Sequence, residues 1–313
     1  MRKRLIILAV VITMALIVTL VILRDPEQAT LSPAVREQAP GDFVLLPQGY
    51  VHYELAGPET GQPVVLVHGF SAPSYTWDLT FQALAAAGYR VLRYDLFGRG
   101  YSDRPETTYD RGLFVQQLHD LLAALAIRLP VDLIGHSMGG AIAADFAAEH
   151  PEMVRKVVLI SPALTPYTSP VNVFLSKILK TPVLGELFMR TVFVPSLPKA
   201  QLRDLYRPER FPDWVERYRL QMQYKGFRRA LLSTARHYIH EDKRYVYQRL
   251  AGEGKPVLLI WGMEDQTNPL AHSQVLRDLL APQFLLVEEA GHLPHVERPD
   301  VVNPRLVDFL RQG

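Results

Sequence analysis

The stretch "LIGHSMGG", Leu133–Gly140, joins an apolar run to a serine that has glycines two places before it and two places after it. The run predicts a buried strand, and "MGGAIAADFAAEHP" predicts a helix directly after it. A sharp turn from strand to helix would hold Ser137 in a strained backbone conformation, with room only for glycine at positions 135 and 139. This is the context of a nucleophile elbow. The pentapeptide alone is equally compatible with a glycine-rich turn that carries an incidental serine.

Strand-like runs alternate with longer helical patterns on both sides of this stretch. The expected strands are "YVHYELAG", "PVVLVHG", "YRVLRYD", "VDLIGHS", "VRKVVLIS", "PVLLIWG" and "QFLLVEE". Alternation of this kind predicts an α/β fold with a mostly parallel sheet, which we expect to have eight strands and helices on both faces.

The alternation stops between Pro162 and about Gly254, where only helical pieces broken by prolines occur. A single sheet interrupted by a helical insertion is the simplest explanation. We therefore expect a core made of residues 43–162 and 255–313, with residues 163–254 forming a helical cap or lid.

Two further residues follow strands in a way that suits general-base chemistry. His292 comes just after "QFLLVEE" in a turn opened by Gly291, and Asp265 comes just after "PVLLIWG". His295 and Glu264 are nearby but weaker candidates. The carboxyl ends of parallel strands meet at one edge of a sheet, so Ser137, Asp265 and His292 are predicted to form a catalytic triad in that chain order.

Several motifs in this order resemble the α/β-hydrolase superfamily, in its capped branch of serine esterases, lipases and peroxidase-like enzymes. They are "LVHGF", "YDLFGRGYSDRP", "LIGHSMGG", "WGMEDQTNP" and "AGHLPHVERP". The resemblance covers the chain from about Phe43 to its C-terminus. It implies an oxyanion hole made by the backbone N–H groups of Phe70 and Met138, with His68 organising the turn, and it implies no cofactor and no metal.

The resemblance also separates two related classes. Epoxide hydrolases and haloalkane dehalogenases share the cap but carry aspartate at the elbow, so Ser137 argues against both. Asp95, Arg99 and Asp103 in "YDLFGRGYSDRP" are interpreted as a hydrogen-bonded loop at the sheet edge, without a role in the chemistry.

Composition excludes other classes of protein. There is no cysteine in the 313 residues, so no disulfide, thiolate metal site or cysteine nucleophile is present. The formal charge is +2, and removing Arg2, Lys3 and Arg4 leaves −1 (2 − 3), which gives no reason to expect nucleic-acid binding.

The N-terminus predicts a membrane anchor. Leu5–Leu23 is 19 residues long without a charge, glycine or proline, and as a helix it would span about 28 Å. We favour an uncleaved anchor over a cleaved signal peptide, whose apolar region is usually shorter, and over a buried core helix. The basic residues 2–4 predict that residues 1–4 form a cytoplasmic tip. The chain would then cross the membrane once, and the catalytic domain would lie on the non-cytoplasmic side. Residues 24–42 are predicted to be a polar linker.

The cap carries two contrasting halves. Its first half is apolar with helical spacing, whereas residues 201–250 contain 12 Lys or Arg against 6 Asp or Glu, interleaved with aromatics. Those aromatics are Tyr206, Phe211, Trp214, Tyr218, Tyr224 and Phe227. The second half is interpreted either as a lid near an anionic membrane surface or as an ordinary lid whose aromatics pack inward.

Taken together, these features predict a membrane-anchored serine hydrolase that cleaves carboxylic esters of small-molecule or lipid substrates with apolar acyl groups. The same triad would also suit a carbon–carbon bond hydrolase, a peptidase, a thioesterase or a cofactor-free peroxidase. A non-catalytic binding protein on a hydrolase scaffold is the alternative from another class. The sequence indicates no oligomeric state.

Overall fold

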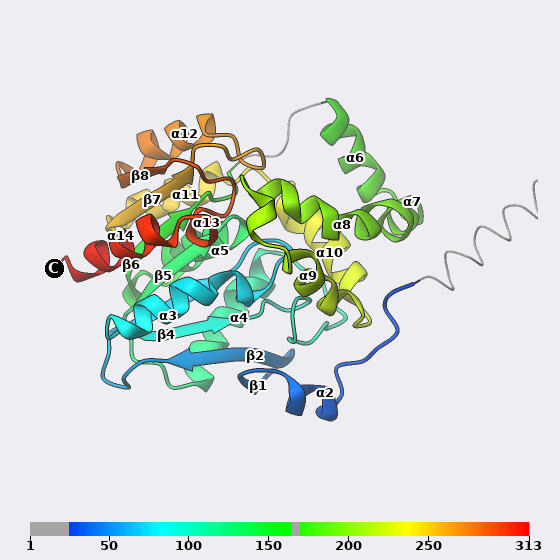
Figure 1. Cartoon of the computed structure of the whole chain (residues 1–313), viewed down its shortest axis with the longest axis horizontal. Coiled ribbons are helices and arrows are strands. Elements are labelled where there is room, and N and C mark those ends of the chain that lie inside the picture. Colours follow the sequence, from blue (N-terminus) through cyan, green and yellow to red (C-terminus); the bar gives the residue numbers. More distant parts are fainter. Residues whose placement is uncertain (1–24, 165–169, 313) are drawn as a thin grey trace, which may run out of the picture.

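One eight-stranded sheet forms the centre of the molecule (Figure 1). The computed structural model describes residues 25–164 and 170–312. The strand order is β1-β2-β4-β3-β5-β6-β7-β8, with antiparallel pairing of β1 with β2 and of β2 with β4, and parallel pairing elsewhere. The strands are β1 (Asp42–Leu46), β2 (Gly49–Ala56), β3 (Pro63–Val67), β4 (Arg90–Tyr94), β5 (Val131–His136), β6 (Val154–Ile160), β7 (Val257–Gly262) and β8 (Gln283–Val287). The predicted eight-stranded, mostly parallel sheet is confirmed.

Helices cover both faces of the sheet because its central strands are apolar on both sides. Within β3, Val65 and Val67 face one buried cluster while Val64 and Leu66 face the other, as the two-residue period of a strand requires. The first cluster includes residues of α4 (Arg111–Ala124), α5 (Met138–Glu149), α11 (Arg244–Gly252) and α12 (Ala271–Leu280). The second includes residues of α3 (Asp78–Ala86) and α14 (Pro299–Arg311), next to the short α13 (Pro294–Glu297).

The cap lies over the end of the sheet where the parallel strands finish (Figure 1). It contains α6 (Pro170–Lys180), α7 (Leu184–Phe188), α8 (Val194–Ala200), α9 (Trp214–Met222) and α10 (Phe227–Thr234), with short turns between them. A separate buried cluster, which includes Met189, Tyr218, Phe227 and Leu231, holds these helices together.

The helix α11 lies within the range predicted as cap but packs against α5 and α12 of the core. Its buried residues Val246, Tyr247 and Leu250 recur at helical spacing and join the main core cluster of the sheet. The helical pattern was visible in the sequence, but a pattern does not say which layer a helix joins. The helices that cover the site therefore end before α11.

The segment predicted as a polar linker is docked along the cap and the core. Residues 25–41, here called the strap, contain the short helix α2 (Pro33–Gln38) and a parallel bridge between Ala29 and Tyr224. The carboxylates of the strap meet cap arginines far away in sequence, and composition alone could not reveal such partners.

The predicted anchor, residues 5–23, lies outside the described residues. Within residues 25–164 and 170–312, no helix has both the length and the apolar character that crossing a bilayer requires.

Candidate active site

Ser137 stands at the turn between β5 and α5 in a strained conformation. Its φ of 53° and ψ of −118° lie in a region that residues with a side chain rarely adopt. The glycines around it are required sterically, because a Cβ at Gly135 would lie 2.2 Å from the Gly139 oxygen and a Cβ at Gly139 would lie 2.2 Å from the Val67 oxygen. The strained turn is fastened by hydrogen bonds from Ser137 N–H to the Ile160 oxygen (2.9 Å) and from Ala163 N–H to the Ser137 oxygen (2.9 Å).

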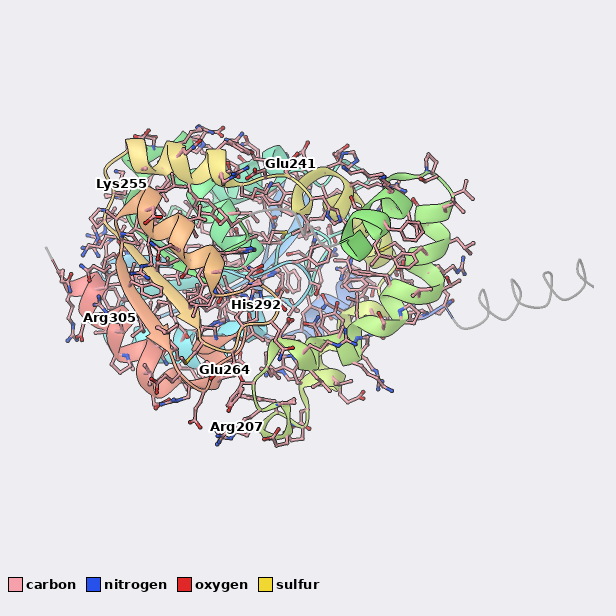
Figure 2. All side chains as sticks on the ribbon, turned by 90° about the horizontal axis from the view of Figure 1, so that it is seen from above. Arg207, Glu241, Lys255, Glu264, His292 and Arg305 are labelled. Carbon is pink, nitrogen blue, oxygen red and sulfur yellow. The ribbon has the colours of Figure 1, made fainter. Side chains whose placement is uncertain are left out.

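His292 and Asp265 meet at the same edge of the sheet. His292 lies in the loop after β8 and Asp265 in the loop after β7, and His292 Nδ1 lies 2.8 Å from Asp265 Oδ2. The ring is 4% exposed. Figure 2 shows His292 between the C-terminal elements and the cap helices. A carboxylate on Nδ1 holds the proton there and leaves Nε2 as the basic nitrogen.

The Asp265 carboxylate is itself held by the backbone. Its Oδ1 accepts hydrogen bonds from the N–H groups of Thr267 (2.9 Å) and Asn268 (2.8 Å). Asn268 in turn donates its side-chain amide to the Ser161 oxygen (2.8 Å), next to the end of β6. One carboxylate oxygen is thus oriented by the loop, and the other is left to orient the imidazole.

Ser137 and His292 line one cavity, together with residues of the cap. The structure describes both side chains, and no hydrogen bond joins Ser137 Oγ to the imidazole. Such contacts often tighten only when substrate is bound. The structure therefore brings the three predicted triad residues to one site, with the His292–Asp265 contact already formed.

The two predicted oxyanion-hole amides flank the serine. Met138 is the first residue of α5, and Phe70 follows Gly69, whose added Cβ would lie 3.4 Å from Ser137 Cβ. In the described part of the chain, neither amide donates a hydrogen bond to a protein acceptor. Two unused N–H groups beside a nucleophile can receive a developing oxyanion.

His68 and Arg99 shape the loop that carries Phe70. The His68 ring bonds through Nδ1 to the Gly69 oxygen (2.8 Å) and through Nε2 to Leu96 N–H (2.9 Å), so it organises the turn. The buried Arg99 donates from Nε to the Phe70 oxygen (2.8 Å) and from Nη2 to Thr234 Oγ1 (2.9 Å). Burial lowers the pKa of Arg99 to about 10. This contact links Arg99 to the loop that carries Phe70 of the predicted oxyanion hole, here called the oxyanion loop, and the sequence pattern did not reveal it.

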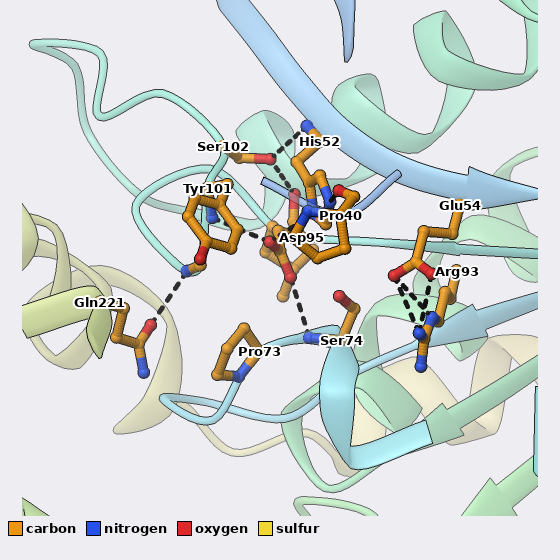
Figure 3. Close-up of polar contacts among 12 residues, drawn as sticks. Pro40, His52, Glu54, Pro73, Ser74, Arg93, Asp95, Tyr101, Ser102 and Gln221 are labelled. Atoms are coloured by element: carbon orange, nitrogen blue, oxygen red, sulfur yellow. Dashed lines mark hydrogen bonds and ion pairs between the residues drawn. The ribbon is translucent and has the colours of Figure 1, made fainter. Parts of the chain in front are cut away.

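The rest of the "YDLFGRGYSDRP" loop is held by a buried network around Asp95 (Figure 3). Asp95 accepts hydrogen bonds from His52 Nδ1 (2.8 Å), Ser74 N–H (2.9 Å) and Tyr101 N–H (2.9 Å). Burial acts to raise the pKa of Asp95, but the charge and hydrogen bond of His52 hold it well below its usual range. Asp103 pairs with Arg36 of the strap at 2.5 Å.

The two weaker candidates have other tasks. Glu264 accepts a hydrogen bond from Ala290 N–H (3.0 Å), at the base of the loop that carries His292. His295 is fully enclosed, packs against the Trp77 ring at a centroid distance of 4.3 Å, and neither of its ring nitrogens has a partner among the described residues. Burial, with some repulsion from His292, lowers the pKa of His295 to about 3, so it is a neutral packing residue.

Asp204, in the cap, is a further acidic residue that sequence reasoning missed. Its backbone oxygen accepts a hydrogen bond from His292 N–H (2.7 Å), and its Oδ1 accepts one from Thr267 Oγ1 (2.5 Å). Burial acts to lower the pKa of His292, but the charge of Asp265, its hydrogen bond and the charge of Asp204 together raise it. No local signal marks Asp204, because only the folding of the cap over the sheet brings it to this loop.

The cavity above the serine has a volume of about 370 Å³ and a mostly apolar lining from the cap. The apolar lining residues are Phe70, Ala72, Ala163, Leu175, Leu179, Phe188, Phe193, Leu197, Ala200, Ala235, Ile239 and Leu293. The polar lining residues from the cap include Gln201, Arg203 and Asp204. Among the residues that the structure describes, no group of three or more His, Asp or Glu is placed to hold a metal ion.

Four of the six aromatic residues in the basic half of the cap are buried, whereas Tyr206 is 41% exposed and Phe211 is partly buried. Trp214, Tyr218, Tyr224 and Phe227 are all buried. Several arginines of this half pair with carboxylates, as in Arg217 with Asp78 and Arg236 with Glu186. Of the two interpretations of this half, the packing favours the ordinary lid.

Comparison with known proteins agrees with this fold. Residues 64–305 match the alpha/beta hydrolase family, and the chain belongs to it. An AB hydrolase superfamily protein of Bacillus subtilis (strain 168) is 30% identical over 286 residues, covering 83% of this chain and 94% of that protein.

Two solved structures show the same fold. A meta-cleavage product hydrolase from Pseudomonas fluorescens IP01 is 25% identical with a TM-score of 0.70, covering 86% of this chain and 97% of that one. An enol-lactonase from Burkholderia xenovorans LB400 is 23% identical with a TM-score of 0.73, covering 87% and 100%. Membership of the family supports hydrolase activity, while these two neighbours carry different activities in their names.

Proposed function

We propose that this chain is a membrane-anchored serine hydrolase that cleaves carboxylic esters with apolar acyl groups. The observation that carries the proposal is Ser137, held on a strained turn in a mostly apolar cavity that His292 also lines, with Asp265 bonded to the far side of the His292 ring. A serine hydroxyl is a weak nucleophile unless an adjacent base accepts its proton. The apolar lining of the cavity suits an acyl chain better than a charged or sugar-like acid.

In the proposed reaction, Ser137 Oγ attacks the ester carbonyl carbon while His292 Nε2 takes the hydroxyl proton. Asp265 stays ionised and stabilises the resulting imidazolium. The amides of Phe70 and Met138 hold the oxygen that becomes negative, and losing one such donor typically costs about 10²–10³ in rate. The intermediate then expels the alcohol, which receives the proton from His292. Water, activated by the same imidazole, releases the acid and restores Ser137.

The anchor in this proposal is the uncharged run Leu5–Leu23, preceded by three basic residues. Basic residues beside a span favour the cytoplasmic side, so the catalytic domain would lie on the opposite side. Flotation of membranes that contain the full chain, followed by protease treatment of sealed vesicles, tests both points. Recovery of the chain in the soluble fraction would contradict the anchor without affecting the triad.

The test of the chemistry is hydrolysis of p-nitrophenyl acetate, butyrate, octanoate and palmitate by the full chain in detergent. We expect turnover that rises with acyl length and disappears in Ser137→Ala. A fluorophosphonate should label the protein at Ser137, and Ser196→Ala, which removes an exposed serine of α8, should keep the label. Labelling without ester turnover would redirect the search to carbon–carbon bonds, thioesters, peptides or peroxidase chemistry. No labelling of folded protein would favour a non-catalytic binding protein.

A further inference from the structure

The part of the cap between residues 174 and 192 carries a concentration of exposed apolar side chains. Five of the fifteen large hydrophobic residues that are exposed in the described chain fall between residues 174 and 192. They are Phe174, Val183, Leu184, Leu187 and Val192, here called the outer apolar face. Figure 1 shows α6 and α7 at the edge of the cap farthest from the sheet. Clustered exposed apolar residues mark an interaction site more often than scattered ones do.

One member of this face is held in a strained conformation. Val183 has φ 64° and is 76% exposed. Positive φ is unfavourable for a β-branched residue, and packing within the monomer does not offset this strain because the side chain is exposed. The inner side of the same helices lines the active-site cavity through Leu175, Leu179 and Phe188. The helices of this region are therefore apolar on both sides, with substrate space on one side and solvent on the other.

The strap fixes where the chain leaves the domain toward the predicted anchor. Asp25 lies 2.9 Å from Nη2 of Arg190, which stands between Leu187 and Val192 in the helical segment Met189–Phe193, and 3.0 Å from Arg228 Nη1. Glu27 accepts hydrogen bonds from the N–H groups of Gly226 (2.9 Å) and Arg228 (2.6 Å) at the start of α10. The start of the strap, at Asp25, is thus bonded to the segment that carries the outer apolar face.

This tie limits the distance between the outer apolar face and a membrane. The predicted anchor ends at Leu23, and the two residues from there to Asp25 reach at most about 7 Å. A bilayer that holds Leu5–Leu23 must therefore come close to Arg190 and the apolar residues on either side of it.

The charges around this face suit an anionic lipid surface. Lys177, Lys180 and Lys199 are exposed, and in the described chain none of them pairs with a carboxylate. Glu186 is the single acidic residue between positions 170 and 199, and its carboxylate lies 3.2 Å from Arg236 Nη1. Lysines around an apolar face attract anionic head groups while the apolar residues enter the interfacial layer.

From these observations we infer that the outer apolar face rests in the anionic bilayer that holds the N-terminal segment, so that acyl substrates reach the cavity from the lipid phase. The inference rests on the proposed anchor and deepens the proposed function by naming a membrane-resident ester as the substrate class. The occupant of the face is the lipid bilayer itself.

The absence of cysteine makes a direct test simple, because any introduced thiol is the single labelling site. The full chain is reconstituted into vesicles of phosphatidylcholine and phosphatidylglycerol as Phe174→Cys, Val183→Cys or Leu187→Cys, each labelled with an environment-sensitive dye. The matched control is Leu45→Cys on β1, whose leucine is 63% exposed, equal to the 63% of Phe174. We expect blue-shifted emission and quenching by nitroxide lipids at the three cap positions and neither effect at position 45.

The outcomes separate this inference from the proposed function. Cap positions that are no more quenched than position 45, in chain that floats with the vesicles, would overturn the inference and leave the anchor and esterase intact. Failure of the chain to float would remove both the anchor and this inference. Quenching without ester hydrolysis would support docking and contradict the esterase.

Two variants test the consequences. Val183→Glu with Leu187→Glu, neither of which lines the cavity, should slow hydrolysis of a vesicle-embedded ester several-fold and leave hydrolysis of p-nitrophenyl acetate unchanged. Glu27→Ala, which releases the strap from α10, should reduce quenching at position 183. Equal losses in the hydrolysis rates of both esters by the double glutamate variant would mean that the substitutions disturb the active site itself, and would contradict docking.

Discussion

Replacing Ser137 by glycine should leave the protein more stable than replacing it by alanine, although both changes remove the same hydroxyl. Ser137 holds φ 53° and ψ −118°, a conformation that a Cβ makes unfavourable. Alanine keeps the Cβ and its strain, whereas glycine removes it. The difference between the two variants therefore measures the strain at the turn, independently of catalysis.

The magnitude follows from two opposing effects. Holding a residue with a side chain in such a region costs about 1–3 kcal/mol. Glycine also gives the unfolded chain more freedom, which lowers stability by about 0.4–1 kcal/mol. The midpoints leave about 1 kcal/mol in favour of glycine. At about 2.1 cal/mol/K of unfolding entropy per residue, a change of this size raises the Tm of a chain of this length by about 2 °C.

The assay is thermal unfolding of the full chain in one detergent, followed by circular dichroism. The matched pair is Ser196→Ala and Ser196→Gly, in the helix α8 without positive φ. There alanine should be more stable than glycine by about 1 kcal/mol, because glycine is unfavourable inside a helix. The difference in stability between the glycine and alanine variants should thus be positive at position 137 and negative at position 196. A Ser137→Gly variant that melts below Ser137→Ala would refute the strain argument.

Three further predictions concern the pH profile, the oxyanion loop and the glycines. The pKa of His292 is raised from 6.5 despite its burial, and only the neutral ring accepts a proton, so kcat/KM should fall as pH drops through a value above 6.5; Asp204→Asn should move this limb to lower pH, and an unmoved limb would contradict a role for that charge. Arg99→Met removes the donor that holds the oxyanion loop and should lower kcat about tenfold or more with little change in KM. Steady-state kinetics that show a raised KM with an unchanged kcat would exclude this positioning role. Gly139→Ala should abolish folding or activity, because its Cβ would lie 2.2 Å from a backbone oxygen, whereas Gly252→Ala, with nothing within 4 Å, should melt no lower than the parent chain.

The sheet and the assembly of the three triad residues could be predicted because each depends on local sequence. A buried strand shows its apolar run directly, as in β5 and β7, and each candidate residue stands immediately after such a run. Parallel strands finish at one edge, so residues that follow different strands are brought together without further information. The glycine at 135 also acts locally, since its neighbours in space are Gly139 and Gly140 of the same turn, whereas Gly139 meets Val67 and His68 at the end of the adjacent strand.

The tertiary structure alone decided the features that join segments distant in sequence. Asp204 reaches the loop of His292 across 88 residues (292 − 204), Arg99 reaches Thr234 in the cap, and the strap pairs with Arg190 and Arg228. Helix α11 joins the core although the helices that precede it in sequence form the cap. Periodicity tells which face of an element is apolar but not which partner covers it, because the choice of partner depends on how all the elements pack at once. For that reason the triad residues could be predicted from the sequence. The residues that contact the triad and its loops from the cap could not, and neither could the face that meets the membrane in our proposal.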